Sequence, residues 1–230
     1  YTWLPVDSKI PTADRPGFAE VRFHKLGDDP KKDRVEHERT GDAKTFLQPQ
    51  LSKDGHFLLL YVQHGWTRTD VYARDLRVPG KSDQGWKPLA TGIDAEFDVE
   101  IFGDRFYVKT NDGAPHYRVF KVDPGKVRRE DWKEIVPERK DATLQNMTIV
   151  GGKLSLGYLK DVVSEVAIFD LDGKKVRDVK LPAPGTASVL SGRDDDDEAY
   201  YSFTSFTYPT EIYETSVKTG QDKLWFRLKL

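Results

Sequence analysis

Histidines, acidic residues and serines are the side chains of this sequence that could perform chemistry. The histidines are scattered, at His24, His37, His56, His64 and His116. Metal sites draw their ligands from short characteristic spacings, which these positions lack, so structural roles are predicted for all five. The acidic run 194–198 lacks the alternating ligands and central glycine of a calcium loop. It is therefore predicted to be a solvated hairpin turn, and no metal is expected.

Neither a serine hydrolase nor a nucleotide-binding motif is present in the sequence. A nucleophile elbow reads G-x-S-x-G, and around Ser155 the first glycine position is taken by Lys153. No glycine-rich phosphate loop occurs. A glycosidase needs two converging carboxylates, and nothing in the sequence selects such a pair. We therefore expect no catalytic residue and no cofactor in this chain, and no peptidase activity from the chain alone.

The charge balance excludes several classes of partner. The 230 residues carry 36 Lys and Arg against 38 Asp and Glu, a net charge of −2. Binding to nucleic acid needs a concentrated basic surface, so neither nucleic acid nor a membrane is expected as a partner. No apolar run is long enough to span a bilayer. Cysteine is absent, which fits a reducing compartment; a cytoplasmic location is expected, with the periplasm and secretion left open.

The elements that must position any site repeat along the chain. Apolar strands begin at His56, Arg105, Lys153 and Ala199, in steps of 49, 48 and 46 residues. Each follows a polar turn and precedes further strand-like runs. A period near fifty built from short strands is typical of β-propeller blades. The second strand of a unit, as in 57–62, is apolar at every position, which predicts cover on both faces.

The predicted fold is all-β, a β-propeller of four-stranded antiparallel blades. A strand fragment at 1–5 and a long polar loop at 6–17 open the sequence. The expected blades are 1–41 (partial), 42–92, 93–139, 140–183 and 184–230. The expected strands are 18–26 and 34–38; 45–51, 57–63, 70–76 and 86–91; 96–102, 105–110, 117–122 and 132–136; 144–150, 153–159, 165–170 and 175–181; 187–190, 199–204, 211–217 and 222–228.

Six segments in this order resemble the propeller of the prolyl oligopeptidase (prolyl endopeptidase) family, bacterial members above all. They are H-x-L-G at 24–27, L-S-x-D-G at 51–55, T-N-D-G-A-P at 110–115, W-x-x-x-V-P-E at 132–138, Y-L-x-D at 158–161 and S-F-x-x-P-x-x-I-Y at 205–213. Each motif is weak alone, but together they run in register along the chain.

The resemblance implies a seven-bladed propeller that caps an α/β-hydrolase domain holding a Ser-Asp-His triad. That domain lies outside this sequence, which would supply about the last five blades. The implied partners are the catalytic domain of the same parent chain and proline-containing peptide substrates. The propeller would limit substrate size and cover the active site. Both ends of the sequence read as strands, so we interpret it as a segment of a longer chain.

The resemblance also directs attention to one edge of the blades. Loops between second and third strands, and segments leading into inner strands, emerge on one face, which would be the hydrolase side. The loop at 6–17 is expected to be a mobile flap, and Phe46 matches by position an apolar residue near the substrate pocket. The other residues expected on these loops are Asp7, Lys9, Asp14, Arg15, Trp66, Asn111, Asp112, Asp161, Ser205 and Tyr208.

Two alternatives from other classes remain open at this point. A stand-alone propeller could serve as a protein-interaction scaffold, which a chain that closes its own ring would favour. A small propeller glycosidase or lyase would instead require two carboxylates that converge in a central tunnel. The sequence does not decide the oligomeric state, nor whether five units close a ring.

Overall fold

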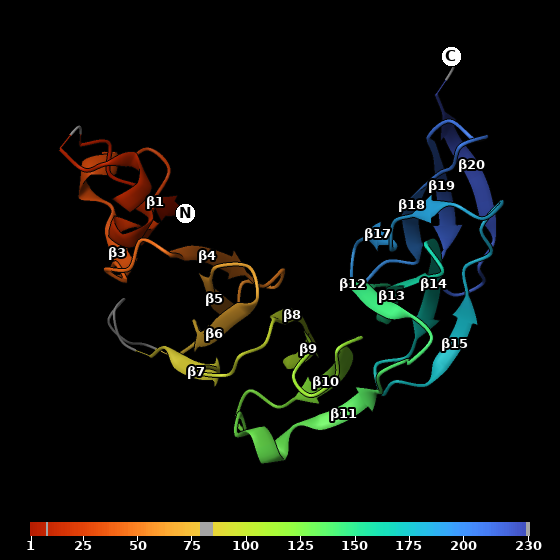
Figure 1. The fold of residues 1–230 in the computed structure, drawn as a ribbon, viewed down its shortest axis with the longest axis horizontal. Helices are drawn as coiled ribbons and strands as arrows, with labels where there is room; N and C mark the ends of the chain where they lie inside the picture. Colours follow the sequence, from red (N-terminus) through yellow and green to blue (C-terminus); the bar gives the residue numbers. More distant parts are fainter. Residues whose placement is uncertain (8, 79–84, 229–230) are drawn as a thin grey trace. The chain divides into compact units, whose positions relative to one another are not determined.

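The computed structural model describes residues 1–7, 9–78 and 85–228, and their regular structure consists of β-strands and short 3-10 helices (Figure 1). Two compact units are present. The first comprises Tyr1–Phe97 with Val127–Arg129, and the second comprises Asp98–Lys126 with Glu130–Leu230. The 3-10 helices are η1 (Thr12–Phe18), η2 (Pro30–Lys32) and η3 (Arg129–Asp131).

The strands form five antiparallel sheets, and in the first four of them each strand pairs with its neighbour along the chain. A three-stranded sheet contains β1 (Thr2–Trp3), β2 (Glu20–Phe23) and β3 (Arg34–His37). The second contains β4 (Thr45–Leu51), β5 (Phe57–His64), β6 (Arg68–Asp75) and β7 (Lys87–Ala90). The third contains β8 (Phe97–Phe102), β9 (Arg105–Thr110), β10 (Arg118–Val122) and β11 (Lys133–Val136).

The last two sheets belong to the second unit. The fourth contains β12 (Thr143–Val150), β13 (Lys153–Lys160), β14 (Val163–Phe169) and β15 (Lys175–Asp178). In the fifth, β16 (Thr186–Ala187) and β17 (Ser191–Gly192) both pair with β18 (Glu198–Thr204), which is followed by β19 (Glu211–Ser216) and β20 (Asp222–Arg227). Most strand bounds fall within two residues of those expected from the sequence.

Burial on both faces of the second strands explains their unbroken apolar sequence. Successive side chains of a strand point to opposite faces, and Leu59 and Leu60 of β5 are both 0% exposed. On β13 the adjacent residues Leu154 and Ser155 are likewise buried, at 0% and 1% exposed. Burial of this kind is the main favourable term in folding, so the second strands carry much of the core.

Apolar clusters join neighbouring sheets within each unit. In the first unit, Val21 of β2 packs in one cluster with Leu47 of β4 and Leu60 of β5. In the second unit, one cluster joins the third and fourth sheets and another joins the fourth and fifth. This face-to-face packing of sheets is the arrangement expected of propeller blades.

The inner strand predicted at 187–190 is interrupted. Ala187 pairs in β16 and the Ser188 amide donates to the Ser202 carbonyl of β18 at 3.0 Å, but the chain then leaves the sheet before β17. The Leu190 amide donates a hydrogen bond of 3.0 Å to Ser155 Oγ, and its carbonyl accepts one of 2.8 Å from Thr148 Oγ1. A Cβ on Gly157 would lie 2.8 Å from Val189 Cγ1, so glycine there lets segment 188–190 approach β13. The buried Leu190 side chain compensates for the lost strand pairing.

The loop expected at 6–17 is also more regular than predicted. Its second half forms η1, which Pro11 precedes with φ −52°, a backbone angle that proline fixes in advance. The Gly41 amide donates to the Gly17 carbonyl at 2.9 Å, and a Cβ on Gly17 would lie 2.9 Å from the Ala43 nitrogen. The loop is therefore closely packed at its end; residue 8 lies outside the described residues.

Three other expected elements differ from the structure. The fragment at 1–5 shortens to Thr2–Trp3, and the strand expected at 18–26 shortens to β2. The strand expected at 175–181 ends at Asp178.

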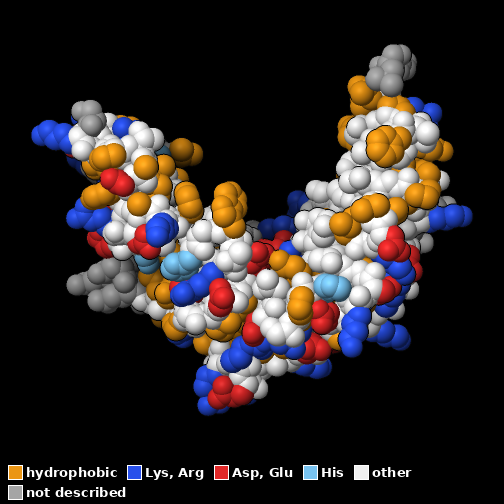
Figure 2. All heavy atoms as spheres, viewed as in Figure 1, with side chains coloured by type: hydrophobic (Ala, Val, Ile, Leu, Met, Phe, Trp, Pro, Cys, Tyr) orange, Lys and Arg blue, Asp and Glu red, His pale blue; other side chains and the backbone are white. Residues whose placement is uncertain are grey.

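On the face shown in Figure 2, basic and acidic side chains are interspersed. No helix of the described residues combines the length and apolarity that crossing a membrane requires.

We expect the variant Leu60→Ala to lower the free energy of unfolding by about 2–5 kcal/mol, because the side chain is fully buried and a cavity would remain. Chemical denaturation of the chain measures this change. Leu76→Ala is the matched control, since Leu76 is 40% exposed and its truncation should have a much smaller effect. Equal effects for the two variants would contradict a core built on both faces of the second strands.

Candidate functional site

One edge of the sheets is built by a hydrogen bond that recurs along the chain. It joins the loop between the second and third strands of a blade to the segment leading into the next sheet, where β1, β2 and β3 of the first sheet count as the second to fourth strands of their blade. The four backbone bonds of this kind are Gly41 N to Gly17 O at 2.9 Å, Thr69 N to Ala95 O at 3.0 Å, Leu144 N to His116 O at 3.0 Å and Ser164 N to Gly185 O at 3.0 Å. Each bond lies within one unit.

We term this edge of each sheet the hairpin edge. It comprises the loops 5–17, 63–69, 111–116, 160–164 and 205–209. The last loop belongs to it because Thr204, at the end of β18, pairs with Thr186, which follows Gly185. Within each unit, the bonds thus place the hairpin loops of neighbouring sheets at one edge, as four-stranded blade geometry predicts.

A nearly buried carboxylate strengthens this connection in the first unit. Asp70 is 7% exposed. Its Oδ1 accepts a hydrogen bond from the Gly92 amide at 2.9 Å, and its Oδ2 accepts one from His64 Nε2 at 2.9 Å. Arg68 Nη2 lies 3.3 Å from Oδ2. One carboxylate therefore joins both strands of the β5–β6 hairpin to the segment between β7 and β8.

The pKa of the Asp70 carboxyl reflects two opposing effects. Burial acts to raise it, but the hydrogen bonds from Gly92, His64 and Arg68 together outweigh burial, and the pKa lies below its ordinary value. A group with a depressed pKa in the folded state stabilises the fold above its unfolded pKa. The Asp70 contacts therefore stabilise the hairpin edge at neutral pH.

The tips of the hairpin loops carry apolar side chains that are almost fully exposed. Trp66 between β5 and β6 is 95% exposed, and Val162 between β13 and β14 is 88% exposed. Val6 and Phe206 are equally open. A single exposed apolar residue is unremarkable, but four of the five hairpin loops carry one; in the loop 111–116 the apolar residue, Ala114, is buried. The hairpin edge thus offers apolar contact points on loops anchored to packed sheets.

Phe46 is not a core residue. It lies on β4 opposite Gln63 and is 51% exposed. Its neighbour Thr45 pairs with His64, directly before the turn that holds Trp66, so Phe46 lies beside the hairpin edge. Its role in a substrate pocket stays a prediction.

The polar residues expected on the first loop form bonds within that loop. Asp7 Oδ1 accepts from the Lys9 amide at 2.9 Å. The Asp14 amide donates to the Pro11 carbonyl at 2.9 Å, and Arg15 Nε lies 3.5 Å from the Ile10 carbonyl. Asp7, Lys9 and Asp14 are exposed, which leaves their charged groups accessible to a partner.

The polar residues expected on the later loops shape their turns. The Asn111 carbonyl accepts from the Ala114 amide at 3.0 Å, and the Asp112 carbonyl accepts from Arg118 Nη2 at 2.6 Å. Ser205 Oγ accepts from the amides of Thr207 and Tyr208. The Tyr208 ring makes an edge contact with Phe203 at 5.8 Å between centroids, and Asp161 is exposed.

Sequence reasoning missed Val162, Phe206 and the His64–Asp70 pair. A signal existed for Val162, because a β-branched residue follows Asp161 in a two-residue hairpin turn, where glycine is preferred. No sequence signal marked Asp70, since its bond to Gly92 depends on a contact between residues 22 positions apart.

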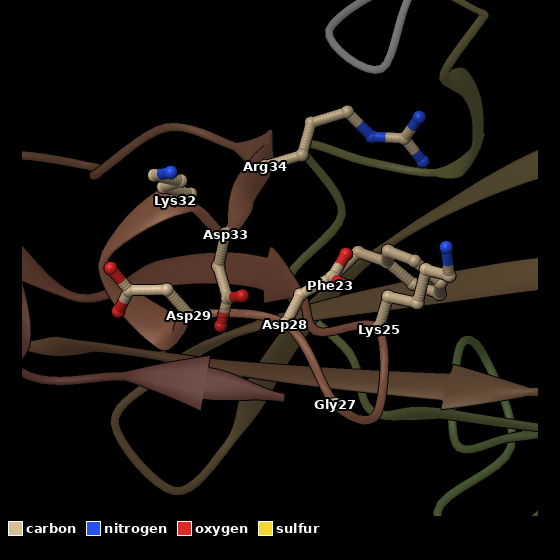
Figure 3. A pocket seen from close by; sticks show the side chains of 8 residues that line it. All are labelled: Phe23, Lys25, Gly27, Asp28, Asp29, Lys32, Asp33 and Arg34. Atoms are coloured by element: carbon tan, nitrogen blue, oxygen red, sulfur yellow. The ribbon is translucent and has the colours of Figure 1, made fainter.

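A pocket of about 600 Å³ lies elsewhere, in the connection between β2 and β3 (Figure 3). Its nearly buried acid is Asp33, which accepts from Tyr1 Oη at 2.7 Å and pairs with His24 Nδ1 at 2.8 Å. The bond from Tyr1, with that from His24, lowers the pKa of Asp33. Both oxygens of Asp33 are thus engaged in joining β1 to this connection, which favours a structural role. The pocket is lined by Phe23, Lys25, Gly27, Asp28, Asp29, Lys32, Asp33 and Arg34.

We expect Asp70→Asn to lower the free energy of unfolding at pH 7 by about 1–3 kcal/mol, because hydrogen bonds to an ionised, nearly buried acceptor are lost. The difference from the wild type should shrink as the pH falls below about 4, the ordinary Asp pKa, and through the lower folded-state value. Urea titrations across pH measure it. Asp98→Asn is the control, since that carboxylate is half exposed in a 3.5 Å ion pair with Lys109 and such pairs contribute little. A pH-independent difference would rule out the ionised Asp70 as the stabilising group.

Comparison with known proteins agrees with this geometry. Residues 1–227 match the family model described as the prolyl oligopeptidase N-terminal β-propeller domain. A prolyl endopeptidase of Elizabethkingia miricola is 28% identical over 212 residues, which cover 92% of this chain and 29% of that protein.

Solved structures extend the match. A prolyl endopeptidase, for which a role of inter-domain dynamics in catalysis and specificity is described, superposes with a TM-score of 0.96 at 51% identity, covering all of this chain and 33% of that one. Prolyl oligopeptidase B from Galerina marginata, bound to a 25mer macrocyclization substrate, shares the fold with a TM-score of 0.88 at 21% identity. The chain spans a third or less of the relatives it matches, and its propeller sheets belong to the N-terminal β-propeller family of prolyl oligopeptidases.

Proposed function

We propose that residues 1–230 are the propeller portion of a serine-type prolyl endopeptidase, and that the hairpin edge covers the active site and limits the size of its peptide substrates. The observation that carries this proposal is the recurrence, in each unit, of exposed apolar side chains on the hairpin loops. Trp66 and Val162 expose apolar surface on loops that the inter-sheet bonds hold in place. An edge of this kind suits a partner surface, because loops that are already held in position lose little conformational entropy when their apolar side chains are buried against a partner.

The partner that the family relation suggests is an α/β-hydrolase domain of the same parent chain. The sequence of residues 1–230 has no G-x-S-x-G motif, so the nucleophile would come from that domain. The propeller would then contribute exclusion of water and of large substrates, which is distinct from bond chemistry. Proline-containing peptides are the substrate class that follows.

The packed sheets and the loops would have different roles in limiting substrate size. Sheets buried on both faces resist deformation, so they can hold an enclosure of fixed size. The enclosure would open by movement of the loops and of the junction between domains, because less tightly packed segments open at a lower free-energy cost. Phe46 would lie near the path of the substrate, at the start of β4 beside the Trp66 hairpin.

In the full-length enzyme, Phe46→Ala should raise KM for a proline-containing peptide several-fold and leave stability almost unchanged, because the side chain is half exposed. Steady-state kinetics and chemical denaturation give the two readouts. Leu47→Ala is the matched neighbour; Leu47 is 6% exposed, so this variant should lose about 2–5 kcal/mol of stability with KM intact. A Phe46→Ala enzyme with lower stability and an unchanged KM would refute a place for Phe46 on the substrate path.

A further inference from the structure

The turn between β13 and β14 combines two features that oppose stability. Asp161 and Val162 have φ values of 47° and 60°, which is the left-handed region at both central positions of a two-residue turn. Asn-Gly and Asp-Gly are preferred in such turns, and a β-branched residue there is a genuine outlier. Val162 is also 88% exposed, so neither its backbone angle nor its side chain gains from the fold.

The β13–β14 hairpin around this turn is otherwise regular. Its strands pair without a break from Lys160↔Val163 to Leu154↔Phe169. The turn is therefore fixed in place, and the strain at Val162 is sustained by pairing on both sides. Strained residues that persist in a well-determined setting are concentrated at functional sites. Because the strain is local and the hairpin is firm, the structure presents the Val162 side chain in a defined position.

A second exposed apolar tip lies on the same edge. Ser164, just after the turn, donates to the Gly185 carbonyl at 3.0 Å, and the next residue, Thr186, pairs with Thr204. Thr204 ends β18 and leads into the loop that holds Phe206, whose side chain is fully exposed. The Phe206 loop is closed by Ser205, which donates its amide to the Tyr208 carbonyl at 3.1 Å. Val162 and Phe206 thus project from neighbouring sheets.

We propose that Val162 and Phe206 form a latch that docks on an apolar surface of the catalytic domain, and that this contact sets how readily the enzyme opens to long substrates. The proposal rests on the proposed function. Burying two exposed apolar side chains would favour the closed state, and a ligand or contact shifts an equilibrium only through such differential stabilisation. The 51% identical prolyl endopeptidase has a chain three times as long, and inter-domain dynamics are described for it, which is why we choose a domain as the occupant.

The strain at Val162 gives the proposal a distinctive test, because removing the valine has opposite effects on stability and on docking. Asparagine tolerates the left-handed region far better than valine does. V162N should therefore leave the stability of the propeller unchanged or raise it, while it removes the apolar contact. F206S should weaken the contact without changing the backbone. V176N is the matched control, since Val176 is an exposed valine on β15, 50% exposed, away from the hairpin edge.

The experiment uses the full-length enzyme. It compares kcat/KM for a short proline-containing peptide with kcat/KM for a long proline-containing peptide. We expect V162N and F206S to raise the ratio of long-substrate to short-substrate kcat/KM several-fold, and V176N to leave it at the wild-type value. Denaturation of each variant should show that V162N is at least as stable as the wild type.

Failure of the latch and failure of the proposed function give different results. If the wild type cleaves after proline and prefers short peptides, but V162N and F206S keep its ratio, the latch is refuted. If V162N lowers stability and leaves the ratio unchanged, the valine serves the fold and the latch is again refuted. A wild-type enzyme that cleaves without regard to peptide length would overturn the gating function itself, and the latch with it.

Discussion

The structure depends on a backbone hydrogen bond that ties four of the five hairpin loops to the segment leading into the next sheet. Burial of both faces of strands such as β5 supplies most of the stability, but burial alone does not fix where a loop lies. A bond such as that from Ser164 to Gly185 does, because its geometry is directional. Within each unit, repetition of this bond holds the loops of successive sheets at one edge.

This arrangement separates stability from function. Residues such as Leu60 and Leu154 are fully buried and stabilise the fold. This stability can offset a few destabilising features elsewhere, which in proteins of marginal stability are often found at functional sites. The unfavourable features are gathered at the hairpin edge, where Val162 is strained and Trp66 is exposed. The same edge carries Asp70, a charged group that remains ionised because its hydrogen bonds outweigh its burial. Rigid sheets with an adaptable edge suit the proposed role of admitting some peptides and excluding others.

Periodicity predicted the fold well, because strands buried on both faces have unbroken apolar runs such as 57–62. It failed where a tertiary contact overrides pairing, as at Leu190, whose bonds to Ser155 and Thr148 interrupt the inner strand. It also missed η1, whose end is fixed by the close approach of Gly17 to residue 43. The edge could be predicted from blade geometry, but the bonds of Asp70 and the exposure of Phe206 depend on three-dimensional placement that no local pattern encodes.

The most direct test of the account is photo-cross-linking in the full-length enzyme from two exposed positions of the first unit. Trp66 lies on the hairpin edge, and Leu26, which is 91% exposed, lies in the β2–β3 connection between the third and fourth strands of its blade. A photoreactive residue at position 66 should form cross-links to residues outside 1–230, within the catalytic domain, and the same residue at position 26 should not. Cross-links to that domain from position 26 and not from position 66 would contradict the claim that the hairpin edge faces the active site.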